Sequence, residues 1–135
     1  MKIYFAGSIS GGRADAPLYA ELIEYLREYG EVPTEHIGDS KLSARGEDMT
    51  PEAVFRRDVD WIRESDTVVA EVTTVSLGVG YEIGFAEQLG KKIICLYRTR
   101  SDHRLSPMIR GNPKLTVVEY DGIEEAKEKL KELLG

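Results

Sequence analysis

The stretch Thr67-Val68-Val69-Ala70-Glu71-Val72, followed closely by Ser76-Leu77-Gly78-Val79-Gly80, decides the fold of this chain. Its first part is strongly β-branched and apolar, which is typical of a buried strand. Its second part is a glycine-rich turn that leads into a helical pattern carrying Ile83 and Ala86 and closed by Gly90. A buried strand, a turn and a helix in succession are the repeating unit of an α/β protein.

The same alternation of strand and helix patterns extends along the whole chain. We expect further strands at Lys2–Ala6, Glu31–Ile37, Lys92–Tyr97 and Leu115–Tyr120. Pro33 weakens the second of these, because proline lacks a backbone N–H. The order predicts one doubly wound α/β domain over residues 1–135, flavodoxin- or Rossmann-like, with a parallel five-stranded sheet. Ligands of such sheets bind beyond the carboxyl ends of the strands.

Length and charge limit the classes of protein that the sequence suits. The 135 residues are enough for one domain with one core. The formal net charge of −6 argues against nucleic-acid polymers as partners, because their binding relies on clustered Lys and Arg. No apolar run is long enough to span a membrane, and the N-terminus runs directly into a strand pattern. We therefore expect a cytoplasmic protein that binds neither nucleic-acid polymers nor membranes.

The single cysteine, Cys95, lies in the apolar run Ile93–Tyr97, so we interpret it as a small buried hydrophobic residue. One cysteine and two histidines do not suit a common structural zinc site. We expect no metal and no cofactor.

The loop Gly7-Ser8-Ile9-Ser10-Gly11-Gly12-Arg13 follows the first strand and is a candidate anion site. Glycines let the backbone approach a ligand, and successive N–H groups can hold a phosphate. The loop has neither the dinucleotide fingerprint nor the lysine of a P-loop. An ordinary strand-to-helix turn explains its spacing equally well.

Two carboxylates are candidates for catalysis. Glu82 falls in the first turn of its helix, where the helix dipole favours the ionised form. It suits a nucleophile or base, or it simply satisfies the dipole. Asp58 is four residues from both Val54 and Ile62, so it lies on the apolar side of its helix, unless it is partly exposed or pairs with Arg57. Two carboxylates at one crevice would suit the cleavage of a glycosidic bond.

Three further sites have two readings each. Tyr4 is either core filler in the first strand or a hydroxyl that orients a carboxylate. His36 is either a surface residue or one that stacks on a ligand. The segment Ser106-Pro107-Met108 lies in a long loop and suits a lid or an oligomer contact.

Several segments together resemble a known family. They are Tyr4–Ile9, Thr34–His36, Asp58 with Trp61, Val68–Val72, Ser76–Gly84 and Leu105–Gly111. They resemble the 2′-deoxynucleoside 5′-monophosphate N-glycosidases, which belong to the nucleoside 2-deoxyribosyltransferase family. The resemblance spans nearly the whole chain, and its most specific part is Ser76–Gly84.

The resemblance implies hydrolysis of a deoxynucleoside 5′-monophosphate to a free base and 2-deoxyribose 5-phosphate. Glu82 matches the nucleophile that attacks C1′ and forms a covalent ester, which water then opens. Asp58 matches the acid that assists departure of the base. Tyr4 matches the tyrosine that orients the nucleophile.

The resemblance also implies how the substrate is held. Residues that match the phosphate-binding loops are Ser8, Ile9, Ser10, Gly11, Gly12 and Ser76, with Gly7 and Gly78 beside them. His36 matches a residue beside the base. Ser106, Pro107 and Met108 match a segment that reaches into the site of a partner subunit, which implies a homodimer.

Two residues depart from the family pattern. Ser10 stands where the mammalian enzymes have an arginine, and Arg13 is close enough in sequence to compensate. Pro107 replaces a small residue in the segment that reaches the partner. Neither departure removes a proposed catalytic group.

Two alternatives remain open. A transferase would move deoxyribose between bases through the same ester, but the serine-rich loop and the ordinary amphipathic helix over 124–134 favour the hydrolase. A nucleotide sensor without catalysis is the other, because fold does not fix function. The presence of Glu82, Asp58 and Tyr4 together argues against it.

Overall fold

The computed structural model describes residues 1–9, 13–39, 42, 48–99 and 104–135. Its centre is a sheet of four parallel strands, in the order β1 (Ile3–Ala6), β2 (Thr67–Glu71), β3 (Lys92–Arg98) and β4 (Thr116–Tyr120). Ala70 lies opposite Ala6 on one side and Cys95 on the other, so these strands end at the same edge of the sheet. The predicted α/β class and parallel sheet are confirmed.

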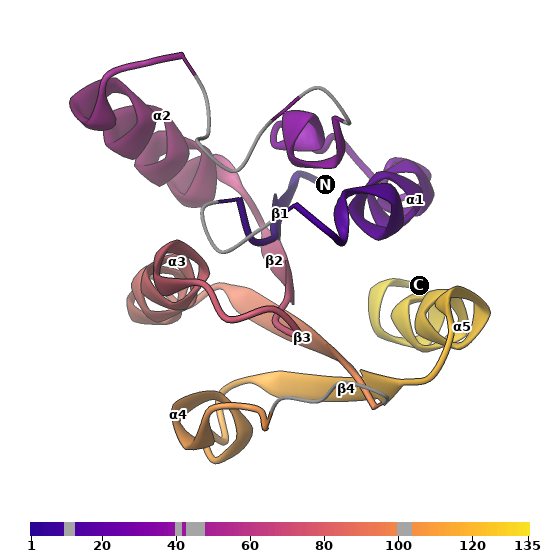
Figure 1. Ribbon diagram of the computed structural model, residues 1–135. Coiled ribbons are helices and arrows are strands. Elements are labelled where there is room, and N and C mark those ends of the chain that lie inside the picture. Colours follow the sequence, from indigo (N-terminus) through magenta and orange to yellow (C-terminus); the bar gives the residue numbers. More distant parts are fainter. Residues whose placement is uncertain (10–12, 40–41, 43–47, 100–103) are drawn as a thin grey trace.

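Helices cover both faces of the sheet (Figure 1). One face carries α1 (Ala16–Leu26) and α5 (Ile123–Leu134). The other carries α2 (Pro51–Glu64), α3 (Leu77–Gln88) and the short helix α4 (Pro107–Arg110). Thr50 caps α2 by accepting a hydrogen bond from the Ala53 N–H at 3.2 Å, as its position before Pro51 predicts.

Each strand sends alternate side chains into two separate cores. Ile3 and Phe5 pack under α1, whereas Tyr4 and Ala6 face α2 and α3. Because both faces are covered, the strands are apolar at nearly every position. Cys95 is fully buried, and burial raises the pKa of its thiol to about 12, which confirms its reading as a core residue.

The predicted fifth strand at Glu31–Ile37 is wrong. Glu31 forms a single parallel bridge with Lys2, and the chain then turns into the 3-10 helix η1 (Glu35–Gly38). The outer edge of β1 is satisfied in another way. The Ile3 N–H donates to the Glu31 carbonyl at 2.8 Å, and the Phe5 N–H donates to the Thr34 hydroxyl at 2.9 Å. The Thr34 side chain thus takes the place of the next backbone hydrogen bond, at the point where Pro33 interrupts the strand pairing.

A buried polar cluster joins the carboxyl ends of β2, β3 and β4. Glu71 is fully buried and accepts hydrogen bonds from the Thr73 N–H at 2.7 Å, the Thr73 hydroxyl at 3.0 Å and the Tyr120 hydroxyl. Burial raises the pKa of Glu71. The Thr73 hydroxyl also accepts from the Arg98 N–H, and the Arg98 guanidinium pairs with Asp15 at 3.0 Å. The start of α1 is thereby fixed to the same edge of the sheet.

No helix in the described part of the chain is long and apolar enough to cross a membrane.

We expect Tyr120→Phe to lower the free energy of unfolding by about 1–3 kcal/mol, because it removes a donor from the buried Glu71 carboxyl. The control is Tyr29→Phe, whose hydroxyl bonds to that of Tyr25 on a partly exposed surface. We expect the control to stay within about 0.5 kcal/mol of the parent protein. Urea unfolding measures both, and equal effects would contradict a structural role for the Tyr120 hydroxyl.

Candidate active site

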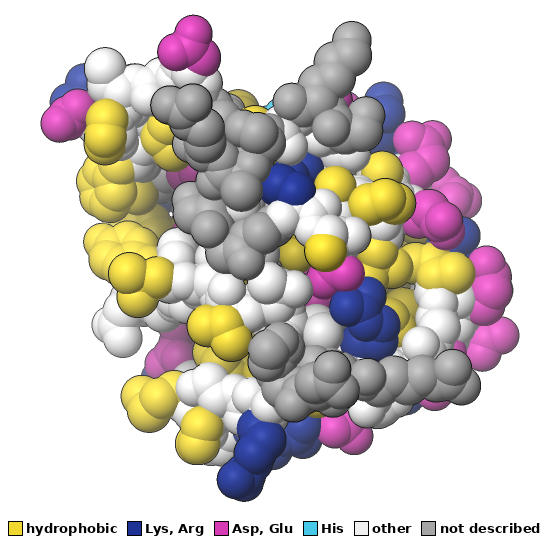
Figure 2. All heavy atoms as spheres, viewed as in Figure 1, with side chains coloured by type: hydrophobic (Ala, Val, Ile, Leu, Met, Phe, Trp, Pro, Cys, Tyr) yellow, Lys and Arg dark blue, Asp and Glu magenta, His cyan; other side chains and the backbone are white. Residues whose placement is uncertain are grey.

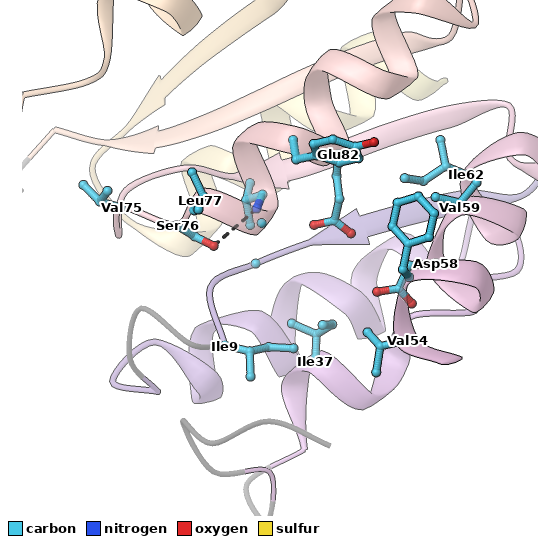
Figure 3. Close-up of a pocket in the computed structure, with 15 residues that line it drawn as sticks. Ile9, Ile37, Val54, Asp58, Val59, Ile62, Val75, Ser76, Leu77 and Glu82 are labelled. Carbon is cyan, nitrogen blue, oxygen red and sulfur yellow. Dashed lines mark hydrogen bonds between the residues drawn. The ribbon is translucent and has the colours of Figure 1, made fainter. Parts of the chain in front are cut away.

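A pocket of about 710 Å³ opens at the carboxyl ends of β1 and β2 (Figure 3). The chain leaves β1 toward Glu31 on one side of that strand and returns to β2 on the other side, so the pocket lies where these two connections diverge. Its walls come from the loop after β1, from η1, from α2 and from the start of α3. The lining residues are Gly7, Ile9, Ile37, Val54, Phe55, Asp58, Val59, Ile62, Val75, Ser76, Leu77, Gly78, Val79, Tyr81 and Glu82.

Glu82 projects into this pocket from α3. Ser76 begins the helix and accepts a hydrogen bond from the Val79 N–H at 3.3 Å. The Tyr4 hydroxyl, which reaches across from β1, donates a hydrogen bond to Glu82 Oε2. The strand and the helix therefore place a tyrosine and a carboxylate in direct contact, as the orienting role of Tyr4 requires.

The charge state of Glu82 differs from what its place on the helix suggests. Burial is the main cause that raises its pKa, to about 7, and the negative charge of Asp58 adds to the rise. The hydrogen bond from Tyr4 and the positive charge of Arg57 act in the opposite direction. The helix dipole favours an ionised carboxylate, whereas burial favours the protonated form.

Asp58 lines the same pocket from α2, and Figure 3 shows the two carboxylates facing one cavity from different helices. The Asp58 side chain is 24% exposed at this pocket. The alternative pairing is also present, because Arg57 Nη2 lies 2.9 Å and Arg57 Nε 3.0 Å from Asp58 Oδ1. Asp58 therefore pairs with Arg57 and lines the pocket at the same time.

His36 lies beside this pair, on η1. Its ring centre is 5.9 Å from that of Trp61, and its Nε2 is 3.5 Å from Arg57 Nη2. The resemblance predicted His36 beside the base. Sequence reasoning did not give Arg57 a role of its own, although its place beside Asp58 and four residues before Trp61 was a usable signal.

The loop after β1 packs tightly against α1. A Cβ on Gly7 would lie 2.9 Å from the Tyr19 ring, so only glycine fits this approach. Ser8 is fully buried, its N–H donates to the Tyr19 hydroxyl at 3.1 Å, and its own hydroxyl has no hydrogen-bond partner among the described atoms. Ile9 lines the pocket. The predicted phosphate residues Ser10, Gly11 and Gly12 lie outside the described residues.

Arg13 is not among the described residues that line the pocket. Its guanidinium donates to the carbonyl oxygens of Ser8, Ile37, Asp39 and Leu42 at 2.5–3.3 Å. These contacts fasten the loop after β1 to η1 and the segment that follows it. The structure therefore gives Arg13 a clear loop-holding role, and its compensation for Ser10 stays a prediction.

The remaining predicted residues divide into two groups. Ser76 and Gly78 line the pocket at the start of α3. The segment at the start of α4, Ser106, Pro107 and Met108, is exposed. None of these three residues lines the pocket. Sequence reasoning missed the apolar side chains of Phe55 and Tyr81 at the mouth, because helical spacing alone does not say which exposed residues border a cavity.

Within the described segments there is no group of three or more His, Cys, Asp or Glu residues placed to hold a metal ion.

The chain is similar to known proteins over nearly its whole length. The profile of the nucleoside 2-deoxyribosyltransferase family matches residues 3–132. A 5-hydroxymethyl-dUMP N-hydrolase of Danio rerio is 46% identical over 140 residues, covering 99% of this chain and 98% of that protein. A protein of the same name from Mus musculus is 52% identical over 111 residues, covering 81% of this chain and 64% of the mouse protein. This chain thus spans less than two thirds of the mouse relative.

A solved structure shares the fold. The structure of Clostridium botulinum CMP N-glycosidase, BcmB, superposes with a TM-score of 0.72 at 26% identity, covering 99% of this chain and 100% of that one. The fold and the site define a parallel α/β protein with paired carboxylates at the carboxyl edge of its sheet. The chain belongs to the nucleoside 2-deoxyribosyltransferase family.

We expect Tyr4→Phe to raise the pKa of Glu82 further above about 7, because the lost hydroxyl favours the ionised carboxylate. Carbon-13 NMR of the labelled glutamate side chain measures this titration directly. Tyr81→Phe is the control, since Tyr81 is exposed at the mouth of the same pocket. An unchanged or lower midpoint in Tyr4→Phe would show that the hydroxyl does not stabilise the ionised form.

Proposed function

We propose that this protein hydrolyses the N-glycosidic bond of 2′-deoxynucleoside 5′-monophosphates, releasing the free base and 2-deoxyribose 5-phosphate. The observation that carries the proposal is the contact of Tyr4 with Glu82, with Asp58 facing the same cavity. The names of the relatives from fish and mouse, both N-hydrolases of a deoxynucleoside monophosphate, support it. So does the glycosidase named in the similar solved structure.

Glu82 acts as the nucleophile in this proposal. One carboxylate oxygen attacks C1′ as the C1′–N bond breaks, through a state with oxocarbenium character that the negative carboxylate stabilises. The base leaves with the bonding electrons and receives a proton from Asp58. Asp58 then takes a proton from water, whose oxygen opens the C1′ ester and restores the Glu82 carboxylate. Tyr4 holds the attacking carboxylate in place through its hydrogen bond.

The phosphate is assigned to backbone N–H groups and hydroxyls. Among the described lining residues of the pocket there is no Lys or Arg. Ser8 offers a buried hydroxyl without a described partner, and Ser76 stands at the N-terminus of α3, where the helix dipole favours an anion. The loop that includes Ser10, Gly11 and Gly12 completes the proposed phosphate site.

A homodimer completes the site in this proposal. Phe55, Leu77 and Tyr81 border the pocket with 56%, 94% and 59% of their surface exposed, and Met108 on α4 is 80% exposed. Figure 2 shows hydrophobic side chains along the side of the molecule where Figure 1 places α2, α3 and α4. A second copy that covers this side would bring its Ser106, Pro107 and Met108 toward the pocket.

We expect Glu82→Gln to lower the release of guanine from dGMP by about 1,000-fold or more, because the amide cannot form the ester. In the parent protein, the rising acidic limb of the kcat/KM profile should have its midpoint at about 7, since the nucleophile must be ionised. Chromatography of the released base measures both. The control is Glu128→Gln, an exposed change on α5 across the sheet. Undiminished turnover in Glu82→Gln would contradict the proposed nucleophile.

The same assay distinguishes the two candidate reactions. Incubation with dGMP tests hydrolysis, and incubation with deoxyguanosine plus free adenine tests base exchange. Exchange without hydrolysis would support the transferase instead. Ribonucleoside monophosphates in the same assay report whether the deoxy sugar is required.

We expect the protein to sediment as a dimer and its subunits to complement each other. Glu82→Gln and Met108→Ala damage different halves of a shared site, so a mixture of the two variants should regain activity that neither has alone. Assays before and after subunit exchange measure this. A fully active monomer would refute the shared site.

A further inference from the structure

We propose that Arg57 is a positioning residue for Asp58, holding its carboxylate in one orientation toward the departing base. The inference rests on the proposed glycosidase function, since it concerns the group that assists base departure. It adds a residue that neither the catalytic triad of Tyr4, Glu82 and Asp58 nor the apolar lining of the pocket includes.

The first observation is that the contact is not a consequence of helix geometry. Side chains at adjacent helix positions do not face each other, so Arg57 must fold back to reach Asp58. Both Arg57 Nε and Nη2 contact the same atom, Asp58 Oδ1, at 3.0 and 2.9 Å. Two nitrogens of one guanidinium thus hold Oδ1 of the Asp58 carboxylate in place.

The second observation is that three residues fix the guanidinium from other directions. Its centre lies 4.6 Å from the centre of the Trp61 ring, one helical turn along α2, in a cation–π contact. His36 Nε2 on η1 is 3.5 Å from Nη2, and Met49 Sδ is 3.2 Å from Nη1. Arg57 is thus held by a ring, an imidazole and a thioether while it contacts Asp58.

A second arginine pair on the same helix shows the contrast. Arg63 lies 3.7 Å from Asp60, and both side chains are more than half exposed, so their attraction is weak. The side chains of Arg57 and Asp58 are 21% and 24% exposed, so solvent screens this pair less. Arg63 also packs on a ring, that of Phe85 at 5.5 Å, which makes it a matched control.

The charge of Arg57 reaches the second carboxylate as well. It favours the ionised form of Glu82, while Asp58 and burial favour the protonated form. One guanidinium therefore orients the acid and eases ionisation of the nucleophile. Among the described residues, the groups that face Arg57 and titrate or carry charge include Asp58, His36, Glu82 and Tyr4.

The test compares Arg57→Met, Arg57→Lys and Arg63→Met on dGMP. We expect Arg57→Met to lower kcat about 10- to 100-fold with little change in KM, because a misplaced group costs mainly the chemical step. Arg57→Lys keeps the positive charge but loses the contact of two guanidinium nitrogens with Asp58. The pKa of Glu82 in this variant should therefore equal that of the parent, while kcat stays low. Arg63→Met should match the parent protein.

A double-mutant cycle tests whether Arg57 acts through Asp58. If it does, then at a pH where Glu82 is ionised in every variant, Asp58→Asn combined with Arg57→Met should be no slower than Asp58→Asn alone. Multiplicative losses, or a kcat for Arg57→Met equal to that of Arg63→Met, would overturn the proposal.

A readout without turnover separates this inference from the proposed function. NMR couplings of Asp58 report its χ1 rotamer, which should be single in the parent and averaged in Arg57→Met. An unchanged rotamer would overturn the positioning role. A parent protein that releases no base from any deoxynucleoside monophosphate would instead refute the proposed function, and the rotamer measurement would still decide the role of Arg57.

Discussion

The parallel register between β1 and β2 is the constraint on which the site depends. Tyr4 pairs with Val68 and Ala6 with Ala70, so both strands end at one edge and both send these side chains toward α2 and α3. This register places the Tyr4 hydroxyl where α3 presents Glu82. A shift of one residue would turn Tyr4 to the opposite face, and the carboxylate would lose its partner.

Two glutamates near this edge, the fully buried Glu71 and the half-buried Glu82, serve different purposes. Burial raises the pKa of both Glu71 and Glu82, and each accepts a hydrogen bond from a tyrosine hydroxyl. Glu71 receives two further hydrogen bonds from Thr73 and is closed in by protein, so it ties strands together. Glu82 also has a raised pKa, but it borders a cavity, so a ligand can reach its carboxylate.

The sequence predicts those parts of the structure that depend on local pattern. The four strands follow from residue type and spacing. The fifth strand fails because the Thr34 side chain satisfies β1 where Pro33 interrupts the ladder, which is a tertiary contact. The raised pKa of Glu82 was missed for the same reason, since burial depends on the helices packed around it. The contacts of the Arg57 guanidinium could not be predicted from the sequence, because they depend on where Trp61 and η1 lie in space.

The raised pKa of Glu82 also links folding to catalysis. Its ordinary value is 4.5 and its value in the folded protein is about 7, so between these limits the folded state binds the proton more tightly than the unfolded chain. The contribution of Glu82 to the free energy of unfolding therefore decreases as the pH rises through this window. As far as Glu82 is concerned, the folded state is most stable at a pH where this carboxylate is protonated and cannot act as a nucleophile. As the pH rises and the carboxylate becomes able to react, the free energy of unfolding decreases.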